Sequence, residues 1–118
     1  MKNIVIIGAG GLAREVQHVI EKINFKKKQW NLIGFIDENP QNKGKLLNDD
    51  VVIGNFDDLP AEIIDQKLYY ICAIGNTKVK KRLVQKANEK KLEPAILVDP
   101  DIYISKSVFI GEGSVIYG

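Results

Sequence analysis

Three small residues near the amino terminus have the spacing of a phosphate-binding turn. Gly8, Gly10 and Ala13 match the pattern G-x-G-x-x-G/A. In this pattern the first glycine permits a tight turn, the second lets the backbone approach a diphosphate, and the third small residue lets a helix pack closely on a strand. The first amides of a helix that begins here have no partner inside it, and the helix dipole favours an anion at this end. The spacing therefore predicts a diphosphate site, with a purely structural strand-to-helix turn as the alternative.

The residues on either side of the turn have the pattern of a βαβ unit that would position it. A run of β-branched residues predicts a buried strand over 3–7, as in a parallel sheet. Apolar residues at helical spacing predict a helix over 11–24; they are Val16, Val19, Ile20 and Ile23.

Polar residues follow two further predicted strands, at 30–36 and 68–74. Asp37 and Glu38 come about two dozen residues after the glycine turn, where a dinucleotide domain holds a ribose. An Asx-turn that starts the loop at Asp37 is an equally good interpretation. The pair Gly75 and Asn76 precedes a predicted helix over 77–91 and places a second loop beside the glycine turn.

The alternation of strands and helices predicts an α/β fold over residues 1–98, with a Rossmann-like parallel sheet flanked by helices. The remaining expected elements are a mobile loop over 41–50, a strand over 51–53, a short helix after Pro60 and a strand over 94–98.

A second periodicity takes over at the end of the chain. Apolar residues recur every six positions, at Val98, Ile104, Ile110 and Ile116, with Ile102, Val108 and Ser114 between them. A six-residue period is typical of a parallel β-helix, so residues 99–118 are predicted to form its first triangular coil. A single coil cannot bury its own core, and we therefore expect the sequence to be the amino-terminal piece of a longer protein.

Composition describes an ordinary protein of about one domain, with 118 residues, 45% of them hydrophobic, and a formal net charge of +2. No apolar run is long enough for a membrane span, and we expect no metal site. The lysines of 78–91 fit the solvated face of a helix, so we expect no nucleic-acid partner. The single cysteine, Cys72, excludes an internal disulfide and suits a cytoplasmic location; we expect it to be a small buried apolar residue.

The two patterns together resemble the bacterial sugar O-acyltransferase family, which includes sialic-acid O-acetyltransferases and N-acetyltransferases of nucleotide-linked 4-amino-sugars. The matching segments are IIGAGG (6–11), REV (14–16), GFIDEN (34–39), VIG (52–54), DDL (57–59), AIGN (73–76) and IGEGSVI (110–116).

The resemblance implies that the amino-terminal domain binds a nucleotide-sugar, and that a left-handed β-helix binds acetyl-CoA between the subunits of a homotrimer. It implies a role in surface glycan or polysaccharide synthesis. The implied substrate-binding residues are Gly8, Gly10, Gly11, Leu12, Ala13 and Arg14 at the phosphate turn, Asp37 and Glu38 near the nucleoside, and Gly75 and Asn76 beside the same cleft.

Two features leave the reaction itself open. The amino-sugar N-acetyltransferases often carry His-Gly where this chain has Leu12 and Ala13, so O- and N-acetylation both stay open. Acetyl transfer needs a general base, which the family takes from a β-helix histidine. The only histidine here, His18, falls on the first predicted helix, so we expect no catalytic residue within this segment.

Two other functions fit part of the pattern. Gly8, Gly10, Ala13 and Asp37 also match the fingerprint of an NAD-binding domain of an oxidoreductase,. A ligand-sensing module with a β-helix as its oligomerisation stalk is the non-enzymatic alternative.

Overall fold

A computed structural model describes residues 1–102 and 110–116 of the chain. Its elements in chain order are β1 (Lys2–Ile7), α1 (Gly11–Lys26), β2 (Trp30–Ile36), the 3₁₀ turn η1 (Pro40–Asn42), β3 (Leu46–Leu47), β4 (Asp50–Gly54), the 3₁₀ turn η2 (Phe56–Asp58), α2 (Ala61–Ile64), β5 (Leu68–Cys72), α3 (Thr77–Glu89), β6 (Glu93–Pro94), β7 (Leu97–Val98) and β8 (Val115–Ile116). None of the described helices has the length and apolar character needed to cross a membrane.

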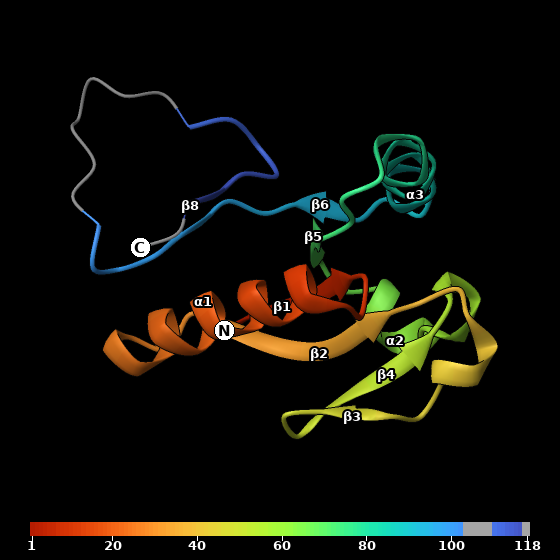
Figure 1. Ribbon diagram of the computed structural model, residues 1–118, viewed down its shortest axis with the longest axis horizontal. Helices are drawn as coiled ribbons and strands as arrows, with labels where there is room; N and C mark the ends of the chain where they lie inside the picture. Colours follow the sequence, from red (N-terminus) through yellow and green to blue (C-terminus); the bar gives the residue numbers. More distant parts are fainter. Residues whose placement is uncertain (103–109, 117–118) are drawn as a thin grey trace.

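Six strands form one sheet in the order β3-β4-β2-β1-β5-β6 (Figure 1). All neighbours pair in parallel, except that β3 runs antiparallel to β4. The chain starts at β1 in the middle, adds β2 and β4 on one side, and then crosses to add β5 and β6 on the other. The predicted α/β fold with a mostly parallel sheet is confirmed.

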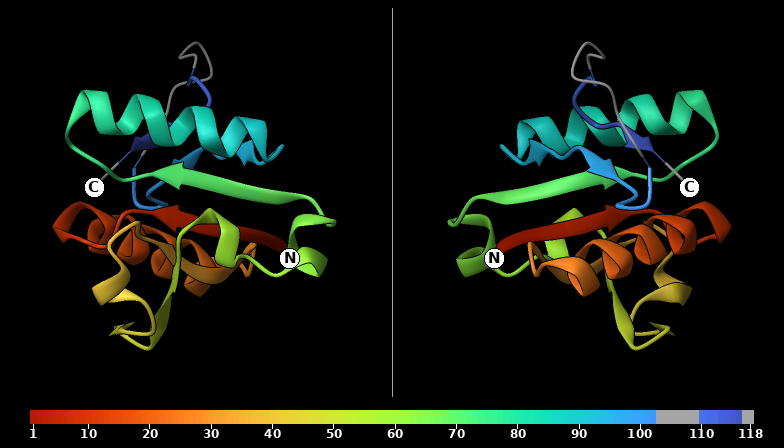
Figure 2. Two further views of the ribbon diagram at one scale, coloured as in Figure 1. Left: turned by 90° about the vertical axis from the view of Figure 1, so that its right-hand side faces the viewer. Right: turned by 90° about the vertical axis from the view of Figure 1, so that its left-hand side faces the viewer.

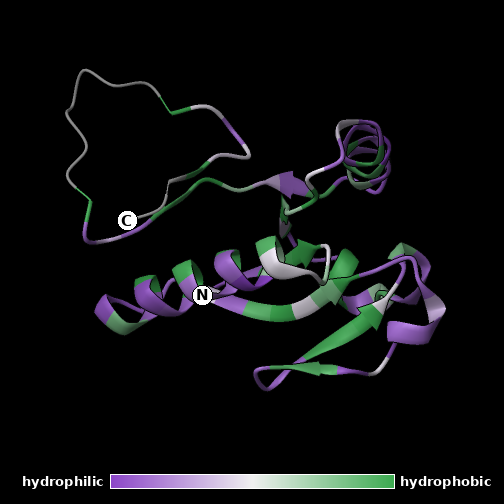
Figure 3. Cartoon of the chain, in the orientation of Figure 1, coloured by the Kyte–Doolittle hydropathy of each residue, from purple (hydrophilic) through white to green (hydrophobic). Residues whose placement is uncertain are grey.

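Helices cover both faces of the sheet, so the fold has three layers (Figure 2). One core lies between the sheet and α1, and includes Ile4 and Ile6 of β1. The other lies between the sheet and α3, and includes Val5 and Ile7 of the same strand. A strand that is buried on both faces has to be apolar throughout, which explains why the middle strands are hydrophobic along their length while the helices carry polar outer faces (Figure 3).

Two expectations about the elements are wrong in detail. The segment 41–50 is not a featureless loop, because Leu46 and Leu47 pair with β4 through a turn at Asn48 and Asp49 that has positive φ angles. The single strand expected over 94–98 is two short strands in different sheets. Of these, β6 extends the main sheet beside β5, whereas β7 pairs with β8.

The end of the chain forms a separate two-stranded sheet in the described residues. Leu97 pairs with Val115, and Val98 with Ile116, in parallel. The predicted repeat positions Ile104 and Val108 lie outside the described residues, and a left-handed β-helix is not seen in the part that the structure describes. The β-helix and the domain boundary after Val98 therefore stay predictions.

Candidate functional site

The glycine turn after β1 is held on both sides by neighbouring strands. The Gly8 amide donates a hydrogen bond to the Ile36 carbonyl oxygen at 2.8 Å, and the Ala73 amide donates to the Ile7 carbonyl oxygen at 2.8 Å. Gly8 has a φ of +119°, and a Cβ there would lie 2.7 Å from the Ala73 carbonyl oxygen. Only glycine fits this conformation and this contact, so Gly8 is required by the packing of β1 on β5.

The next two glycines are free of such contacts and form an open helix start. Gly10 is the N-cap residue of α1 and offers no side-chain hydrogen bond, and the first turn carries no acidic residue. A Cβ at Gly10 or Gly11 would meet no atom within 4 Å. Ala13 is fully buried against the sheet, as its predicted packing role requires. The first amides of α1 are therefore open to a bound anion, with the helix dipole in its favour.

Two exposed side chains flank this open helix start. Leu12 is 39% exposed although it is apolar. Arg14 is exposed and makes no ion pair with any described residue. A guanidinium in this position supplies positive charge and up to five hydrogen-bond donors to an anion beside the helix.

The open turn lies where ligands bind in sheets of this type. Its strand β1 is the point at which the strand order reverses, since β2 lies on one side and β5 on the other. Crevices at such a switch point, outside the carboxyl ends of parallel strands, are the usual ligand sites of open α/β sheets. The structure thus brings together the turns after β1, β2 and β5 and the first turn of α1, where all the predicted substrate-binding residues lie.

Asp37 forms the Asx-turn that was the alternative to a ribose contact. Its Oδ1 accepts a hydrogen bond from the Asn39 amide at 3.0 Å, and its Oδ2 accepts one from Asn42 Nδ2 at 2.7 Å. Both carboxylate oxygens thus stabilise the loop after β2.

Glu38 is paired with two cations of α3. Arg82 donates from both terminal nitrogens to the two carboxylate oxygens of Glu38, at 2.8 and 2.9 Å, and Lys86 Nζ lies 2.9 Å from Oε2. The hydrogen bonds from Arg82, and then from Lys86, lower the pKa of Glu38 to about 2. This ion triad fastens the loop after β2 to α3. Arg82 and Lys86 were not among the predicted site residues, although their i, i+4 spacing places them on one helix face.

The second predicted loop caps its own helix. Asn76 is the N-cap residue of α3, and its Oδ1 accepts a hydrogen bond from the Val79 amide at 3.1 Å. The start of α3 therefore has a side-chain acceptor in place, whereas the start of α1 has none. Of the two helix starts at this edge of the sheet, α1 is the one that suits an anion.

Comparison with known proteins gives a family match over most of the chain. Residues 3–87 match the family model described as the PglD N-terminal domain. Among solved structures, PerB from Caulobacter crescentus in complex with CoA and GDP-perosamine is similar with a TM-score of 0.76 and 26% identity, covering 98% of this chain and 51% of that one. The acetyltransferase domain of PglB from Neisseria gonorrhoeae FA1090 in complex with acetyl coenzyme A is similar with a TM-score of 0.71 and 26% identity, covering 97% and 52%.

A third solved structure shares the fold alone. RSP, a Rex-family repressor, in complex with β-NADH has a TM-score of 0.62 at 22% identity, covering 99% of this chain and 54% of that one. A search of curated proteins finds no significant match. The chain spans about half the length of each of these three solved structures.

Proposed function

Because the chain belongs to the family of PglD N-terminal domains, we propose that it is the substrate-binding part of an acetyl-CoA-dependent sugar acetyltransferase. The substrate is a nucleotide-sugar or sugar of surface glycan synthesis. Its diphosphate lies on the first turn of α1, beside Gly10, Gly11 and Arg14. The PerB complex with CoA and GDP-perosamine supports the substrate class, and the PglB complex with acetyl coenzyme A supports the acetyl donor.

The observation that carries this proposal is the uncapped start of α1 at the switch point of the sheet. Within residues 1–102 and 110–116, no side-chain cap is recorded for this helix start, the space over Gly10 and Gly11 is open, and Arg14 lies in the first turn. A diphosphate supplies what this turn lacks, namely hydrogen-bond acceptors and negative charge.

The parallel pairing of β7 with β8 supports a β-helix that continues from this domain. Paired residues are 18 positions apart, which equals three six-residue repeats, or one turn of a triangular coil. In the proposed full-length protein this left-handed β-helix binds acetyl-CoA and forms a homotrimer.

Acetyl transfer requires a base that takes a proton from the acceptor hydroxyl or ammonium as it attacks the thioester. The only histidine of the sequence, His18, is exposed in the middle of α1. We assign it no part in the reaction, and we place the base outside this segment.

Calorimetry tests the proposal directly. UDP or GDP, and a sugar derivative of the same nucleotide, should bind to the wild-type chain, and NAD should not. The variant Gly10→Ala should weaken nucleotide binding about tenfold, or about 1.4 kcal/mol, because its methyl group projects into the space of the diphosphate. Binding of NAD without any response to nucleoside diphosphates or their sugars would instead support the oxidoreductase alternative.

The loop after β2 argues against that alternative. An NAD-binding domain uses a carboxylate at this position to accept the ribose hydroxyls. Here Asp37 accepts from Asn39 and Asn42, and Glu38 is held by cations of α3. Both carboxylates are thus already engaged in holding the loop, so a ribose would share them with these partners.

A further inference from the structure

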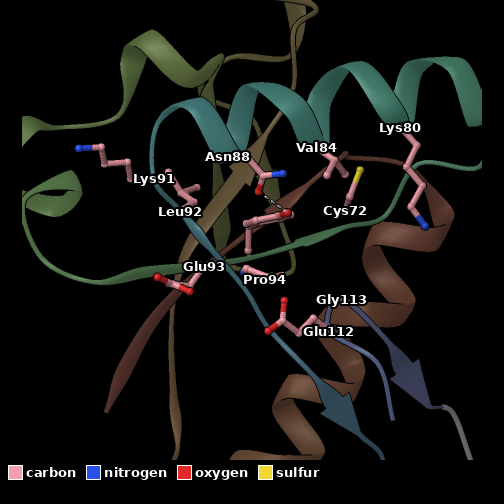
Figure 4. Close-up of a pocket in the computed structure, with 11 residues that line it drawn as sticks. Cys72, Lys80, Val84, Asn88, Lys91, Leu92, Glu93, Pro94, Glu112 and Gly113 are labelled. Atoms are coloured by element: carbon pink, nitrogen blue, oxygen red, sulfur yellow. Dashed lines mark hydrogen bonds between the residues drawn. The ribbon is translucent and has the colours of Figure 1, made fainter. Parts of the chain in front are cut away.

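A cleft of about 770 Å³ lies beside α3, on the side of the sheet where β5 and β6 pair (Figure 4). We name it the α3 cleft and define it by Tyr70, Cys72, Lys80, Asn88, Glu93 and Glu112, which lie among its walls. Its strand side comes from β5 and β6, its helix side from α3, and its third side from the turn at 112–113.

The carboxy-terminal turn is held in this position by the segment that follows β6, namely the connection to β7 and β7 itself. The Gly113 amide donates a hydrogen bond to the Ala95 carbonyl oxygen at 2.8 Å, and the Leu97 amide donates to the Ser114 carbonyl oxygen at 2.9 Å. Glu112 therefore faces the cleft from a segment that is distant in sequence from α3 and β5. The cleft is a composite of the α/β domain and the segment that follows it.

The chemistry of the walls is that of a site for a polyhydroxylated ring. Tyr70 and its neighbours Val84 and Leu92 give an apolar floor. The Tyr70 hydroxyl donates to Asn88 Oδ1 at 3.0 Å, which leaves the two amide hydrogens of Asn88 as donors. Glu112 makes no ion pair with a described residue, so its carboxylate can accept from hydroxyl or ammonium groups. The remaining walls are mostly polar, with charged side chains such as Lys91 and Glu93 around the apolar floor, and such groups can donate to and accept from the hydroxyls of a sugar.

One end of the cleft lies close to the proposed diphosphate site. Cys72 ends β5 and Lys80 lies in the first turns of α3, and both line this end. Ala73, the residue after Cys72, packs against Gly8 of the glycine turn. A ligand at the switch point extends across the ends of the strands on both sides of β1. If its nucleoside lies toward β2, the group on its second phosphate lies toward β5.

From this placement we propose that the α3 cleft is the subsite for the sugar of the nucleotide-sugar. Lys80 faces the second phosphate, and Asn88 and Glu112 hold polar groups of the sugar ring. This inference rests on the proposed function, and it adds that the segment after the α/β domain contributes Glu112 to substrate binding.

Cys72 provides the test in the wild-type chain, because it is the only cysteine of the sequence and lines the cleft. Burial raises the pKa of its thiol, so alkylation by iodoacetamide is followed at alkaline pH. GDP-perosamine, GDP-mannose or UDP-glucose, whichever binds in calorimetry, should slow the labelling about tenfold at ten times its Kd, because only the free fraction reacts. The matching free GDP or UDP should bind without slowing it.

The outcomes separate this inference from the proposed function. If a sugar nucleotide and its diphosphate both bind and neither protects Cys72, the sugar subsite is wrong while the diphosphate site stands. Equal protection by both also overturns it, because the nucleotide itself would then occupy the cleft. If none of them binds, the proposed function fails and the sugar subsite fails with it.

A pair of variants adds an independent readout. Glu112→Gln should weaken binding of the sugar nucleotide about tenfold, the loss of one charged hydrogen bond, and leave binding of the free diphosphate unchanged. Glu62→Gln, at an exposed site on α2, is the matched control and should change neither. An unchanged affinity for the sugar nucleotide in Glu112→Gln would overturn the assignment of Glu112.

Discussion

At the scale of single residues, the glycines of the turn after β1 look alike in sequence but have different tasks. Gly8 is fixed by a positive φ and by its contact with Ala73, whereas the space over Gly10 and Gly11 is empty. The consensus assigns the tight turn to Gly8 and the approach to a diphosphate to Gly10, whereas the family resemblance implies a substrate contact for Gly8, Gly10 and Gly11. The structure adds that Gly8 also lies against the Ala73 carbonyl oxygen after β5, a contact that the consensus pattern does not predict.

This difference predicts unequal effects of the same substitution, Gly to Ala, on the free energy of unfolding. Gly8→Ala should lower the free energy of unfolding by about 2 kcal/mol or more, because the new Cβ meets the Ala73 carbonyl oxygen in an unfavourable backbone conformation,. Gly10→Ala should change it by less than about 1 kcal/mol. Urea unfolding of both variants measures this, and equal losses in the two would contradict it.

At the scale of elements, the ion triad of Glu38, Arg82 and Lys86 joins the loop after β2 to α3. The resemblance implies that Asp37 and Glu38 lie near the nucleoside, which stays a prediction. The carboxylate of Glu38 accepts a bidentate contact from Arg82, and this contact holds the loop in one position. Any nucleotide that binds here meets a preorganised loop, which reduces the ordering cost of binding.

The ion triad makes the free energy of unfolding depend on pH between about 4.5 and 2. The pKa of Glu38 is about 2 in the folded chain against an ordinary 4.5, so its contribution is complete above about pH 4.5 and is lost as the pH falls toward 2. Glu38→Gln should lower the free energy of unfolding by about 1 kcal/mol at pH 7, since the pair is partly exposed.

Urea unfolding between pH 7 and pH 2 tests this. The gap between wild type and Glu38→Gln should narrow as the pH falls from 4.5, and Glu62→Gln should show no such gap. A gap that is constant with pH would show that Glu38 contributes through packing and not through its charge.

Elements with a strong local signal were predictable, and those that depend on distant partners were not. The turn after β1 and the helices α1 and α3 follow from periodicity and from glycine positions. The edge strand β3 depends on a turn with positive φ at Asn48 and Asp49, which carries no glycine. The α3 cleft was missed because its walls come from three separate parts of the chain.

At the scale of the whole molecule, α1 connects the proposed diphosphate site to the segment after β7. Near its far end, Lys22 Nζ lies 2.6 Å from Asp99 Oδ2 and 3.1 Å from Asp101 Oδ2. The Asp99 carboxylate also accepts from the Asp101 amide at 2.9 Å. This contact fixes the start of the carboxy-terminal segment against the helix.

The two aspartates form a matched pair for testing that contact. Asp99 has a side chain that is 4% exposed, whereas that of Asp101 is 59% exposed. Asp99→Asn should lower the free energy of unfolding by about 2 kcal/mol, because it weakens a buried charged hydrogen bond. Asp101→Asn should lower it by less than about 1 kcal/mol. Thermal or urea unfolding measures both, and a larger loss in Asp101→Asn would contradict the assignment.

Because β1 is buried on both faces, hydrophobic burial alone does not fix its register against β2 and β5. Ile4 and Ile6 enter one core and Val5 and Ile7 the other, so sliding the strand by one position would exchange side chains of nearly equal volume. Hydrophobic burial therefore discriminates weakly between the two alignments. The native alignment places Gly8 at the position where any side chain would clash with the Ala73 carbonyl oxygen. A shifted strand would place a residue with a side chain there, so Gly8 selects the native register.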